Sequence, residues 1–234
     1  MRVVVLTGAG ISAESGLRTF RAADGLWEDH HVEDVATPEA FARDPDLVQR
    51  FYNQRRKDAA AAKPNAAHKA LAELARYTDL TLITQNVDDL HERGGSPAVI
   101  HMHGALGGAF CAACGQKMAA PMVMTTDDPC PSCGAKAMRP DIVWFGEMPY
   151  HMDEIWDAVA KAEVFAAIGT SGNVYPAAGL AQHARRCGAR TVELNLTTSA
   201  VSRDFDERFE GPASQVVPKW VAAMIAPYSK KAPS

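Results

Sequence analysis

Short apolar runs separated by longer helical stretches give the first picture of the fold. Apolar and β-branched residues dominate positions 3–6, 80–84, 164–168 and 191–194. Runs of this length with few polar residues predict strands that are buried on both faces, as in a parallel sheet. Segments with helical spacing lie between these runs, so strands and helices alternate along the chain. The sequence therefore predicts an α/β fold with a doubly wound, parallel, Rossmann-like sheet.

Residues 27–77 have the character of a helical module. Pro38, Pro45 and Pro64 each begin a segment of helix-forming residues, and proline is favoured in the first turn of a helix. We therefore expect three helices here, before the sheet resumes. Further helices are predicted at residues 176–186 and 212–225.

The composition is that of an ordinary globular chain. Of 234 residues, 47% are hydrophobic and 22% are charged, and the formal net charge is -4. This charge does not favour a nucleic-acid partner, and no apolar run approaches the ~18 residues needed to span a membrane. Because the first predicted strand begins at Val3, we expect no signal peptide and a cytoplasmic location.

A glycine-rich turn follows the first predicted strand. Gly8, Gly10 and Ala13 fit the pattern G-x-G-x-x-G/A, and a helix is expected to begin near Ser12. After a strand and before a helix, this pattern is typical of a loop whose backbone N–H groups hold the pyrophosphate of a dinucleotide. A strand-to-helix turn that binds no ligand is the alternative interpretation.

The segment after this turn departs from an ordinary dehydrogenase. A Rossmann unit places a second strand and an acidic residue about 20 residues after the motif, where the acid binds the adenine ribose. Residues 19–31 have no strand pattern, so we interpret Thr19, Phe20 and Arg21 as part of a loop over the cofactor. Asn195, which ends a later predicted strand, is the candidate that replaces the missing acid.

Polar and small residues follow two other predicted strands. Gln85, Asn86 and Asp88 come directly after residues 80–84, and a Gly-Thr-Ser turn at 169–171 ends the next apolar run. Ligands bind at the carboxyl ends of strands in open α/β sheets, so both stretches are candidate nucleotide contacts. Capping of a following helix is the alternative role for Asn86 and Asp88.

Two histidines lie near the end of residues 99–104. If this stretch is a strand, alternation places His101 and His103 on one face. A single histidine is more often structural than catalytic, but His103 precedes a glycine at a strand end beside the expected nucleotide site. Only histidine changes its charge near neutral pH without a perturbed pKa, so it is the candidate general base.

Four of the five cysteines form a C-x₂-C-x₁₅-C-x₂-C pattern at Cys111, Cys114, Cys130 and Cys133. This spacing is a strong signal for zinc, and four thiolates make a closed tetrahedral shell, so we expect a structural rather than a catalytic ion. A redox role would need one pair with a lowered thiol pKa rather than two matched pairs. Cys187 is expected to be a packed thiol.

Two further stretches are candidate substrate contacts. Tyr52 and Arg55 lie three residues apart, so they are neighbours on a predicted helix. A guanidinium and a phenol at this spacing can hold a carboxylate, although spacing alone favours a solvated charge at Arg55. Residues 139–149 form an apolar extended stretch that can add a peptide strand through backbone hydrogen bonds. A loop that bridges the core is the alternative there.

Together these motifs resemble the sirtuin family of NAD-dependent protein deacylases. The likeness covers nearly the whole chain, and Val87, where the family usually has isoleucine, is a small departure. Tyr52 and Arg55 resemble the Tyr-x-x-Arg pair of the class III branch, which binds the carboxylate of succinyl- or malonyl-lysine, and short bacterial proteins of that branch are the nearest likeness. The matching stretches are GAGISAESGLRTFR (8–21), QNVD (85–88), HMHG (101–104), the two cysteine pairs, VWFGEMP (143–149), GTSGNVYPAAG (169–179), VELN (192–195) and GPASQVVP (211–218).

The resemblance implies roles for individual residues. The implied catalytic residues are His103, as general base, and Asn86. The implied NAD-binding residues are Gly8, Ala9, Gly10, Ile11, Ser12, Ala13, Gly16, Phe20, Arg21, Trp27, Gln85, Asn86, Val87, Asp88, His103, Gly169, Thr170, Ser171, Asn195, Leu196, Thr197 and Ala213. The implied substrate-binding residues are Tyr52, Arg55, Val143, Phe145, Gly146 and Glu147.

The resemblance also implies a mechanism. Nicotinamide leaves as the acyl-lysine oxygen attacks the ribose, and His103 then draws a proton from the ribose hydroxyls. The products are free lysine, nicotinamide and O-acyl-ADP-ribose, so NAD is a co-substrate, and one structural zinc ion is expected. The acyl-lysine peptide is expected to bind as an added strand beside residues 143–149, and the small residues Ala22 and Ala23 are consistent with a wide acyl pocket.

The expected domain division follows from the same motifs. Residues 1–26, 78–104 and 140–234 are expected to form the Rossmann-like NAD-binding domain. Residues 27–77, as a helical module, and residues 105–139, as a zinc ribbon, are expected to form the small domain. We expect acyl-lysine proteins or peptides as partners, no nucleic acid, no membrane, and a monomer.

Three other functions share part of this pattern. An NAD-dependent dehydrogenase is disfavoured by the missing second strand and by the cysteine ribbon. A zinc-ribbon nucleic-acid binder is disfavoured because Lys117, Lys136 and Arg139 are too few basic residues for a phosphate footprint. Mono-ADP-ribosylation of protein shares the first chemical step and stays open.

Overall fold

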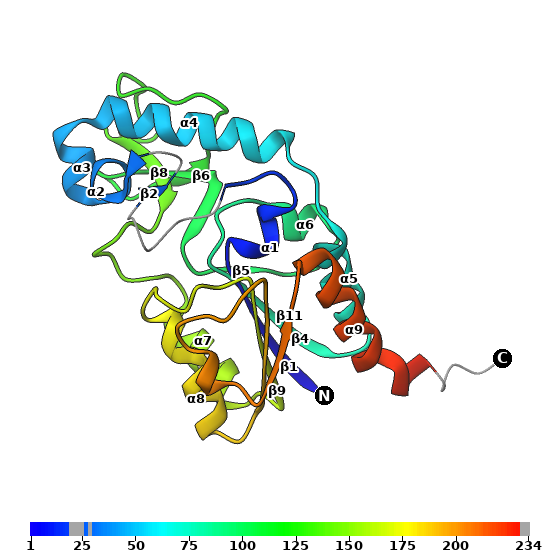
Figure 1. The fold of residues 1–234 in the computed structure, drawn as a ribbon. Coiled ribbons are helices and arrows are strands. Elements are labelled where there is room, and N and C mark those ends of the chain that lie inside the picture. The colour runs from blue at the N-terminus through cyan, green and yellow to red at the C-terminus, as the bar shows by residue number, and fades with distance from the viewer. Residues whose placement is uncertain (19–25, 28–29, 230–234) are drawn as a thin grey trace.

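A six-stranded parallel sheet forms the centre of the larger part of the molecule (Figure 1). The computed structural model describes residues 1–18, 26–27 and 30–229, with only the backbone at 26, 27 and 229. The strand order is β11-β10-β9-β1-β4-β5, and each neighbouring pair is parallel. These strands are β1 (Arg2–Thr7), β4 (Asp79–Thr84), β5 (Ile100–His101), β9 (Val164–Ile168), β10 (Arg190–Asn195) and β11 (Glu207–Glu210). The predicted α/β fold with a parallel sheet is confirmed.

Helices cover both faces of this sheet, because successive residues of a buried strand point to opposite sides. Val3 and Val5 of β1 share a core with α5 (Ala66–Leu74) and α9 (Ala213–Ser229). Val4 and Leu6 pack on the opposite face with α7 (Met152–Ala160) and α8 (Leu180–Arg186), and Figure 1 shows the two pairs of helices on either side of the strands. Among the described helices, none combines the length and the apolar character needed to cross a bilayer.

A smaller module lies beyond the carboxyl ends of the strands (Figure 1). Thr37 caps α3 by accepting a hydrogen bond from Ala40 N, and Asp44 caps α4 by accepting one from Leu47 N. Each cap precedes a proline in the first helical turn, as the sequence predicts for Pro38 and Pro45. The module contains α2 (Val32–Val35), α3 (Pro38–Arg43), α4 (Pro45–Ala61) and an antiparallel sheet of β7 (Lys117–Ala119), β6 (Gly104–Cys111) and β8 (Met138–Ile142).

Several short elements differ from the sequence-based expectation. The helix after the glycine turn, α1 (Gly10–Ala13), is a single turn, and β2 (Leu26–Trp27) pairs with β3 (His30–His31) where a helical module was expected to begin. The third helix starts at Ala66 rather than Pro64, because the side chain of Asn65 caps it. The prediction of a packed thiol at Cys187 is wrong, since this residue is exposed at the end of α8.

The position of α5 bears on the domain boundary. Leu71 and Leu74 of α5 belong to the same core cluster as Val3 of β1 and Val217 of α9. Residues 66–74 therefore pack on the large sheet, although the sequence suggested that they belong to the small module. We propose that the boundary between the two parts lies near the end of α4 rather than at residue 77.

Candidate active site

A cleft with a volume of about 520 Å³ opens between the carboxyl ends of the strands and the small module. The loops after β1, β4, β9 and β10 line one wall, and Ala36, Arg55 and residues 142–147 line the other. This volume lies in the range of pockets that hold cofactors and drug-sized ligands. The chain switches direction across the sheet between β1 and β9, and such a switch point is where open α/β sheets bind ligands.

The glycine turn is shaped by its contact with the loop after β9. A Cβ atom on Gly10 would lie 2.7 Å from Gly169 Cα, and one on Gly8 would lie 2.8 Å from the Gly169 carbonyl oxygen. Gly169 itself has a φ of 62°, which favours glycine. The N–H groups of Gly8 and Gly10 donate to the carbonyls of Ile168 and Gly169, both at 2.9 Å. The N–H groups of Gly8 and Gly10 are therefore already engaged in hydrogen bonds within the protein, contrary to the expectation that they hold a pyrophosphate. The two glycines instead allow the close approach of the two loops.

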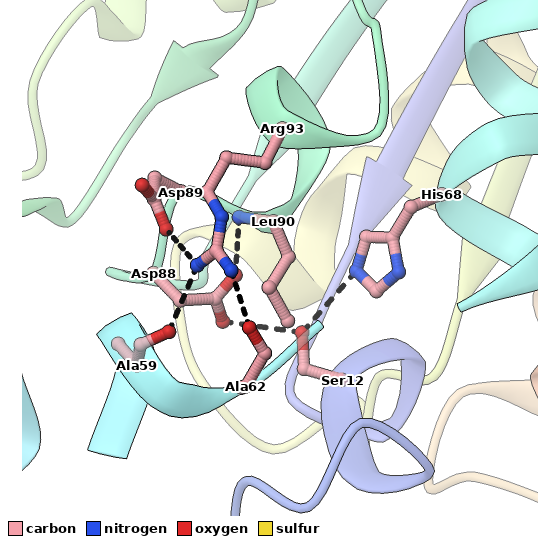
Figure 2. A network of polar contacts seen from close by, with 8 residues as sticks. All are labelled: Ser12, Ala59, Ala62, His68, Asp88, Asp89, Leu90 and Arg93. Carbon is pink, nitrogen blue, oxygen red and sulfur yellow. Dashed lines mark hydrogen bonds and ion pairs between the residues drawn. The ribbon is translucent and has the colours of Figure 1, made fainter. Parts of the chain in front are cut away.

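Ser12 lies at the centre of a polar network on the floor of the cleft (Figure 2). Its Oγ donates to Asp88 Oδ2 at 3.1 Å and accepts from Asn86 Nδ2 at 3.2 Å. Asn86 Nδ2 also donates to the Gly8 carbonyl, and Asp88 Oδ1 accepts from Leu90 N. Asp88 therefore binds the first residue of the helix that follows, although Asp89 is the N-cap of that helix, and Asn86 is fixed toward the glycine turn.

His68 supports this network from beneath. Its Nδ1 accepts from the backbone N–H of Asn65, so its hydrogen is on Nε2, which lies 3.4 Å from Ser12 Oγ. Burial lowers the pKa of His68 to about 4, so the ring is neutral at physiological pH. Burial also raises the pKa of Asp88, although the hydrogen bonds from Leu90 N and Ser12 favour its charged form.

Arg93 ties the cleft floor to the small module. In Figure 2 its guanidinium reaches from α6 (Leu90–Arg93) to the carbonyls of Ala59 and Ala62 at the end of α4. It also donates to Asp89 Oδ1 at 3.1 Å. Since Asp89 directly follows Asp88 in the chain, the C-terminal end of α4 is held close to the polar floor of the cleft.

The two histidines of the HMHG stretch differ in their surroundings. β5 ends at His101, and His103 lies in the following turn, so strand alternation does not extend to it. His103 lines the cleft, and its Nδ1 donates to the Gln85 carbonyl at 3.1 Å. Burial lowers the pKa of His103, partly offset by this hydrogen bond, so Nε2 carries a lone pair at neutral pH. This is the state that a general base requires.

His101, in contrast, is held by the protein. Its Nδ1 lies 3.2 Å from the Asn86 carbonyl and its Nε2 lies 2.7 Å from Glu92 Oε1. Burial opposes the charged form of His101, but the hydrogen bond and charge of Glu92 outweigh it and raise the pKa. We interpret His101 as a structural residue behind the loop that carries Asn86.

The far end of the cleft is built by α4 and the segment after β8. Arg55 lines the cleft and is itself buried. Tyr52, one turn earlier on α4, is fully buried, and its hydroxyl oxygen accepts a hydrogen bond from Trp144 Nε1 at 3.0 Å. Glu147 also lines the cleft, but Arg139 holds both of its carboxylate oxygens, at 2.8 and 3.0 Å. Its side chain is therefore committed within the protein.

The cleft brings together most of the residues that the sequence singled out. Those that line it are Gly8, Ala9, Gly10, Ser12, Arg55, Gln85, Asn86, Val87, Asp88, His103, Val143, Phe145, Gly146, Glu147, Gly169, Thr170, Ser171, Asn195 and Thr197. Of the described candidates, Ile11 and Ala213 are buried in the core beneath, whereas Ala13, Gly16 and Leu196 are exposed and Tyr52 is buried behind Trp144. Phe20, Arg21, Ala22 and Ala23 lie outside the described residues, and only the backbone of Trp27 is described.

Sequence reasoning missed a second group of lining residues. They are Leu17, Arg18, Ala36, Ile142, Trp144, Pro149, Asn173, Val174, Tyr175, Thr198, Ser199 and Ala200. Several of them lie inside or next to the stretches that carry the motifs, so their position beside a motif was the one available signal. The sequence gives no such signal for Ala36, because tertiary packing alone brings it to the cleft.

The two C-x-x-C pairs meet at one end of the small antiparallel sheet. All four Sγ atoms lie within 4.8 Å of one another, with Cys111 to Cys133 at 3.7 Å and Cys114 to Cys130 at 3.8 Å. Four sulfurs bound at ~2.3 Å around one tetrahedral zinc ion would lie ~3.8 Å apart, so this spacing fits the metal. The predicted four-cysteine zinc site is confirmed in its geometry.

Comparisons with known proteins agree with this architecture. A profile described as "Sir2 family" matches residues 8–176. The chain belongs to the Sir2 family. An NAD-dependent protein deacylase from Bdellovibrio bacteriovorus is 55% identical over 229 residues, which cover 95% of this chain and 96% of that protein. The match between this sirtuin and that deacylase therefore extends along almost the full length of both chains.

Solved structures of the same family have this fold. A Sir2 homologue in complex with NAD has a TM-score of 0.88 and 41% identity, and the match covers 96% of this sirtuin and 90% of that chain. A structure described as Sir2 with p53 peptide and NAD+ has a TM-score of 0.79 and 29% identity, with coverage of 98% and 94%. The expected resemblance to sirtuins is confirmed.

The zinc site gives the first testable prediction. Cys130→Ser should release the ion and unfold the ribbon of this sirtuin, because a structural zinc site contributes folding free energy directly. Metal content by elemental analysis and thermal unfolding followed by circular dichroism would measure both effects. The matched control is Cys187→Ser, which removes an exposed thiol away from the cluster and should change neither. A wild-type protein purified without zinc would contradict the assignment.

Proposed function

We propose that this chain is an NAD-dependent protein-lysine deacylase that removes acetyl and also succinyl or malonyl groups. The observation that carries the proposal is the position of His103 on the wall of the cleft, with its Nε2 lone pair available, beside the floor that holds Asn86 and Asp88. Close relatives with the name NAD-dependent protein deacylase support it. The proposed products are free lysine, nicotinamide and O-acyl-ADP-ribose.

The chemistry of the cleft fits NAD. Polar residues from four strand ends line the cleft, among them Asn86, Thr170 and Asn195, and residues of these types can bind ribose and carboxamide groups. When bound, NAD would supply the ribose carbon that receives the acyl oxygen, with nicotinamide as its leaving group. The Asn86 amide, held by Gly8 and Ser12, would orient a group on the cleft floor without having to reorganise.

His103 is the proposed general base. Gln85 fixes its ring and places the hydrogen on Nδ1, so Nε2 is the atom that accepts a proton from a ribose hydroxyl. The lowered pKa keeps the ring neutral at physiological pH. The carboxyl group of Asp88 is buried and accepts a hydrogen bond from Ser12. In this position it could bind a hydrogen-bond donor of the substrate.

Arg55 and Tyr52 are the proposed acyl-selective residues. A buried guanidinium on the cleft wall would bind a carboxylate at the end of the acyl chain through charge-assisted hydrogen bonds. Burial raises the pKa of Tyr52 well above its ordinary value, so the phenol stays neutral at physiological pH. An acetyl group has no carboxylate and would gain nothing from either residue.

Acyl-lysine peptides are the proposed partners. The segment 143–147 follows an edge strand and lines the cleft, so a peptide could lie beside it as an added strand. The related Sir2 structure with p53 peptide supports this kind of substrate. A cytoplasmic location, a monomeric state and the lack of a nucleic-acid partner remain predictions from the sequence.

Mass spectrometry of acylated peptides would test the proposed function. With NAD, the protein should convert acetyl-, malonyl- and succinyl-lysine peptides to free lysine and release nicotinamide together with O-acyl-ADP-ribose. Without NAD no peptide should change. Transfer of ADP-ribose to the peptide with the acyl group intact would favour mono-ADP-ribosylation, and reduced NADH as product would favour a dehydrogenase.

The role of His103 predicts the pH dependence. Protonation of the base should abolish turnover, so kcat/KM should rise with pH, and the midpoint of the rise should lie below the ordinary histidine pKa of ~6.5, because the pKa of this histidine is lowered. His103→Ala should lose at least ~100-fold in kcat but retain NAD binding by calorimetry. His183→Ala, on α8 away from the cleft, is the control and should behave as wild type. Undiminished turnover by His103→Ala would remove the general-base assignment.

The acyl preference gives a separate prediction. Arg55→Met should lower kcat/KM for a succinyl-lysine peptide by ~10- to 100-fold more than for an acetyl-lysine peptide, because only the succinyl group presents a charge to the guanidinium. Steady-state kinetics on both peptides would measure the ratio. Arg50→Met removes an exposed charge from the same helix and should leave the ratio unchanged. Equal losses on the two peptides would count against the clamp.

A further inference from the structure

The loop after β10 (residues 196–201) forms part of the cleft wall. Its residues that line the cleft are Thr197, Thr198, Ser199 and Ala200, and three of these four side chains carry a hydroxyl group. A hydroxyl group can both donate and accept a hydrogen bond. A loop of this composition can therefore bind the ribose and phosphate groups of a nucleotide.

The strand order separates this loop from the proposed catalytic residues. β10 and β4 are three positions apart in the order β10-β9-β1-β4, so their carboxyl ends lie ~14 Å apart. Asn86 and His103 line the cleft after β4 and β5, on the far side from β10. Since the proposed mechanism needs the nicotinamide ribose beside His103, the adenosine half of NAD would extend toward the loop after β10. ADP-ribose contains the same half.

A buried carboxyl group holds this loop from behind. Glu193 of β10 is only 4% exposed, and it is not among the residues that line the cleft. Its Oε2 accepts a hydrogen bond from Ser202 Oγ at 2.5 Å, and Ser202 Oγ in turn accepts one from Ser199 N at 2.8 Å. Because Ser199 lines the cleft, these hydrogen bonds connect the strand to the cleft wall through Ser202.

The direction of the Ser202 hydroxyl depends on Glu193. A backbone N–H can only donate, so Ser202 Oγ accepts from Ser199 and has its own hydrogen left to donate. Glu193 accepts this hydrogen, and Ser202 is itself buried. Without the carboxyl oxygen, a buried hydroxyl would lose its acceptor. This loss would raise the free energy of the ordered loop and favour its movement.

The other side of the loop contacts the turn after β9. Ala200 N donates to the Ser171 carbonyl at 3.1 Å. A Cβ atom on Gly172 would lie 2.6 Å from Val201 Cγ2, so the two segments approach closely. The loop is therefore held at two points, and the one that fixes Ser199 depends on the carboxyl group of β10.

We propose that Glu193 is a positioning residue for NAD, which holds the loop after β10 in the shape that binds the adenosine half of the dinucleotide. Its effect passes through Ser202, because Glu193 itself does not line the cleft. A loop that is ordered before NAD arrives loses less conformational entropy on binding. The inference rests on the proposed function, which places the nicotinamide half beside His103.

Calorimetry with ADP-ribose, on the protein with its zinc, tests this inference. Glu193→Leu keeps a side chain of similar size but removes the acceptor for Ser202, so the Kd for ADP-ribose should rise about 5- to 10-fold. KM for NAD should rise by a similar factor. The kcat at saturating NAD and the KM for an acetyl-lysine peptide should stay close to wild-type values. Glu193→Gln retains an oxygen that can accept from Ser202 and should bind ADP-ribose nearly as well as wild type.

Further variants show whether the effect passes through the hydrogen bond. Ser202→Ala should also weaken ADP-ribose binding, and the double variant with Glu193→Leu should bind no more weakly than the weaker single variant. Ser202→Ala carries the test alone if Glu193→Leu does not fold. The matched control is Glu207→Leu on the neighbouring strand β11. It removes a carboxyl group that pairs with Arg190 at the surface, and binding should not change.

The outcomes separate this inference from the proposed function. An unchanged Kd in a folded Glu193→Leu protein would overturn the inference, and so would an equal loss in Glu193→Gln or additive losses in the double variant. Equal rises in KM for NAD and for the peptide would indicate a merely structural glutamate and would also overturn it. Binding of ADP-ribose needs no turnover. If Glu193→Leu weakens this binding while the wild type removes no acyl group, the positioning role stands and the proposed function fails.

Discussion

The contact between the glycine turn and the loop after β9 is the constraint on which the site depends. Gly8 and Gly10 approach Gly169 so closely that a Cβ on any of the three would overlap backbone atoms. Two backbone hydrogen bonds then lock the loops together at the point where the chain changes direction across the sheet. Because the two loops share this contact, the cleft has a rigid floor before any ligand binds.

A chain of hydrogen bonds connects residues of the proposed site to that floor. The Gly8 carbonyl holds Asn86, Asn86 binds Ser12, and Ser12 donates to Asp88. Neutral histidine rings beneath the floor avoid a buried positive charge, since burial lowers the pKa of His68 to about 4 and of His91 to about 3. These two rings therefore add no net charge to the network. The imidazole of His103, the proposed base, lies instead on the wall of the cleft.

Local patterns in the sequence predicted the parts that depend on few residues. The buried strands, the cysteine cluster and the residues at strand ends follow from hydrophobic runs and fixed spacings. The packing of α5 on the large sheet, the burial of Tyr52 behind Trp144 and the use of the Gly8 and Gly10 amides did not follow. Each of these depends on contacts between residues far apart in the chain, which no local pattern records. The start of α5 at Ala66 was missed for a local reason, because the Asn65 cap prevailed over the proline signal.

The two ends of the cleft are not independent, because contacts between distant residues join them. Arg93 binds the carbonyls at the end of α4 from the helix that follows Asp88, so the helix with Arg55 and Tyr52 is anchored to the floor of the cleft. At the other side, Trp144 joins Tyr52 to the segment beside which a peptide would lie, and Val143 N donates to the His103 carbonyl at 2.9 Å. A shift of α4 would thus disturb both the floor of the cleft and the wall that carries His103. The helix with Arg55 and the loop with the proposed base are held as one unit because these contacts join them.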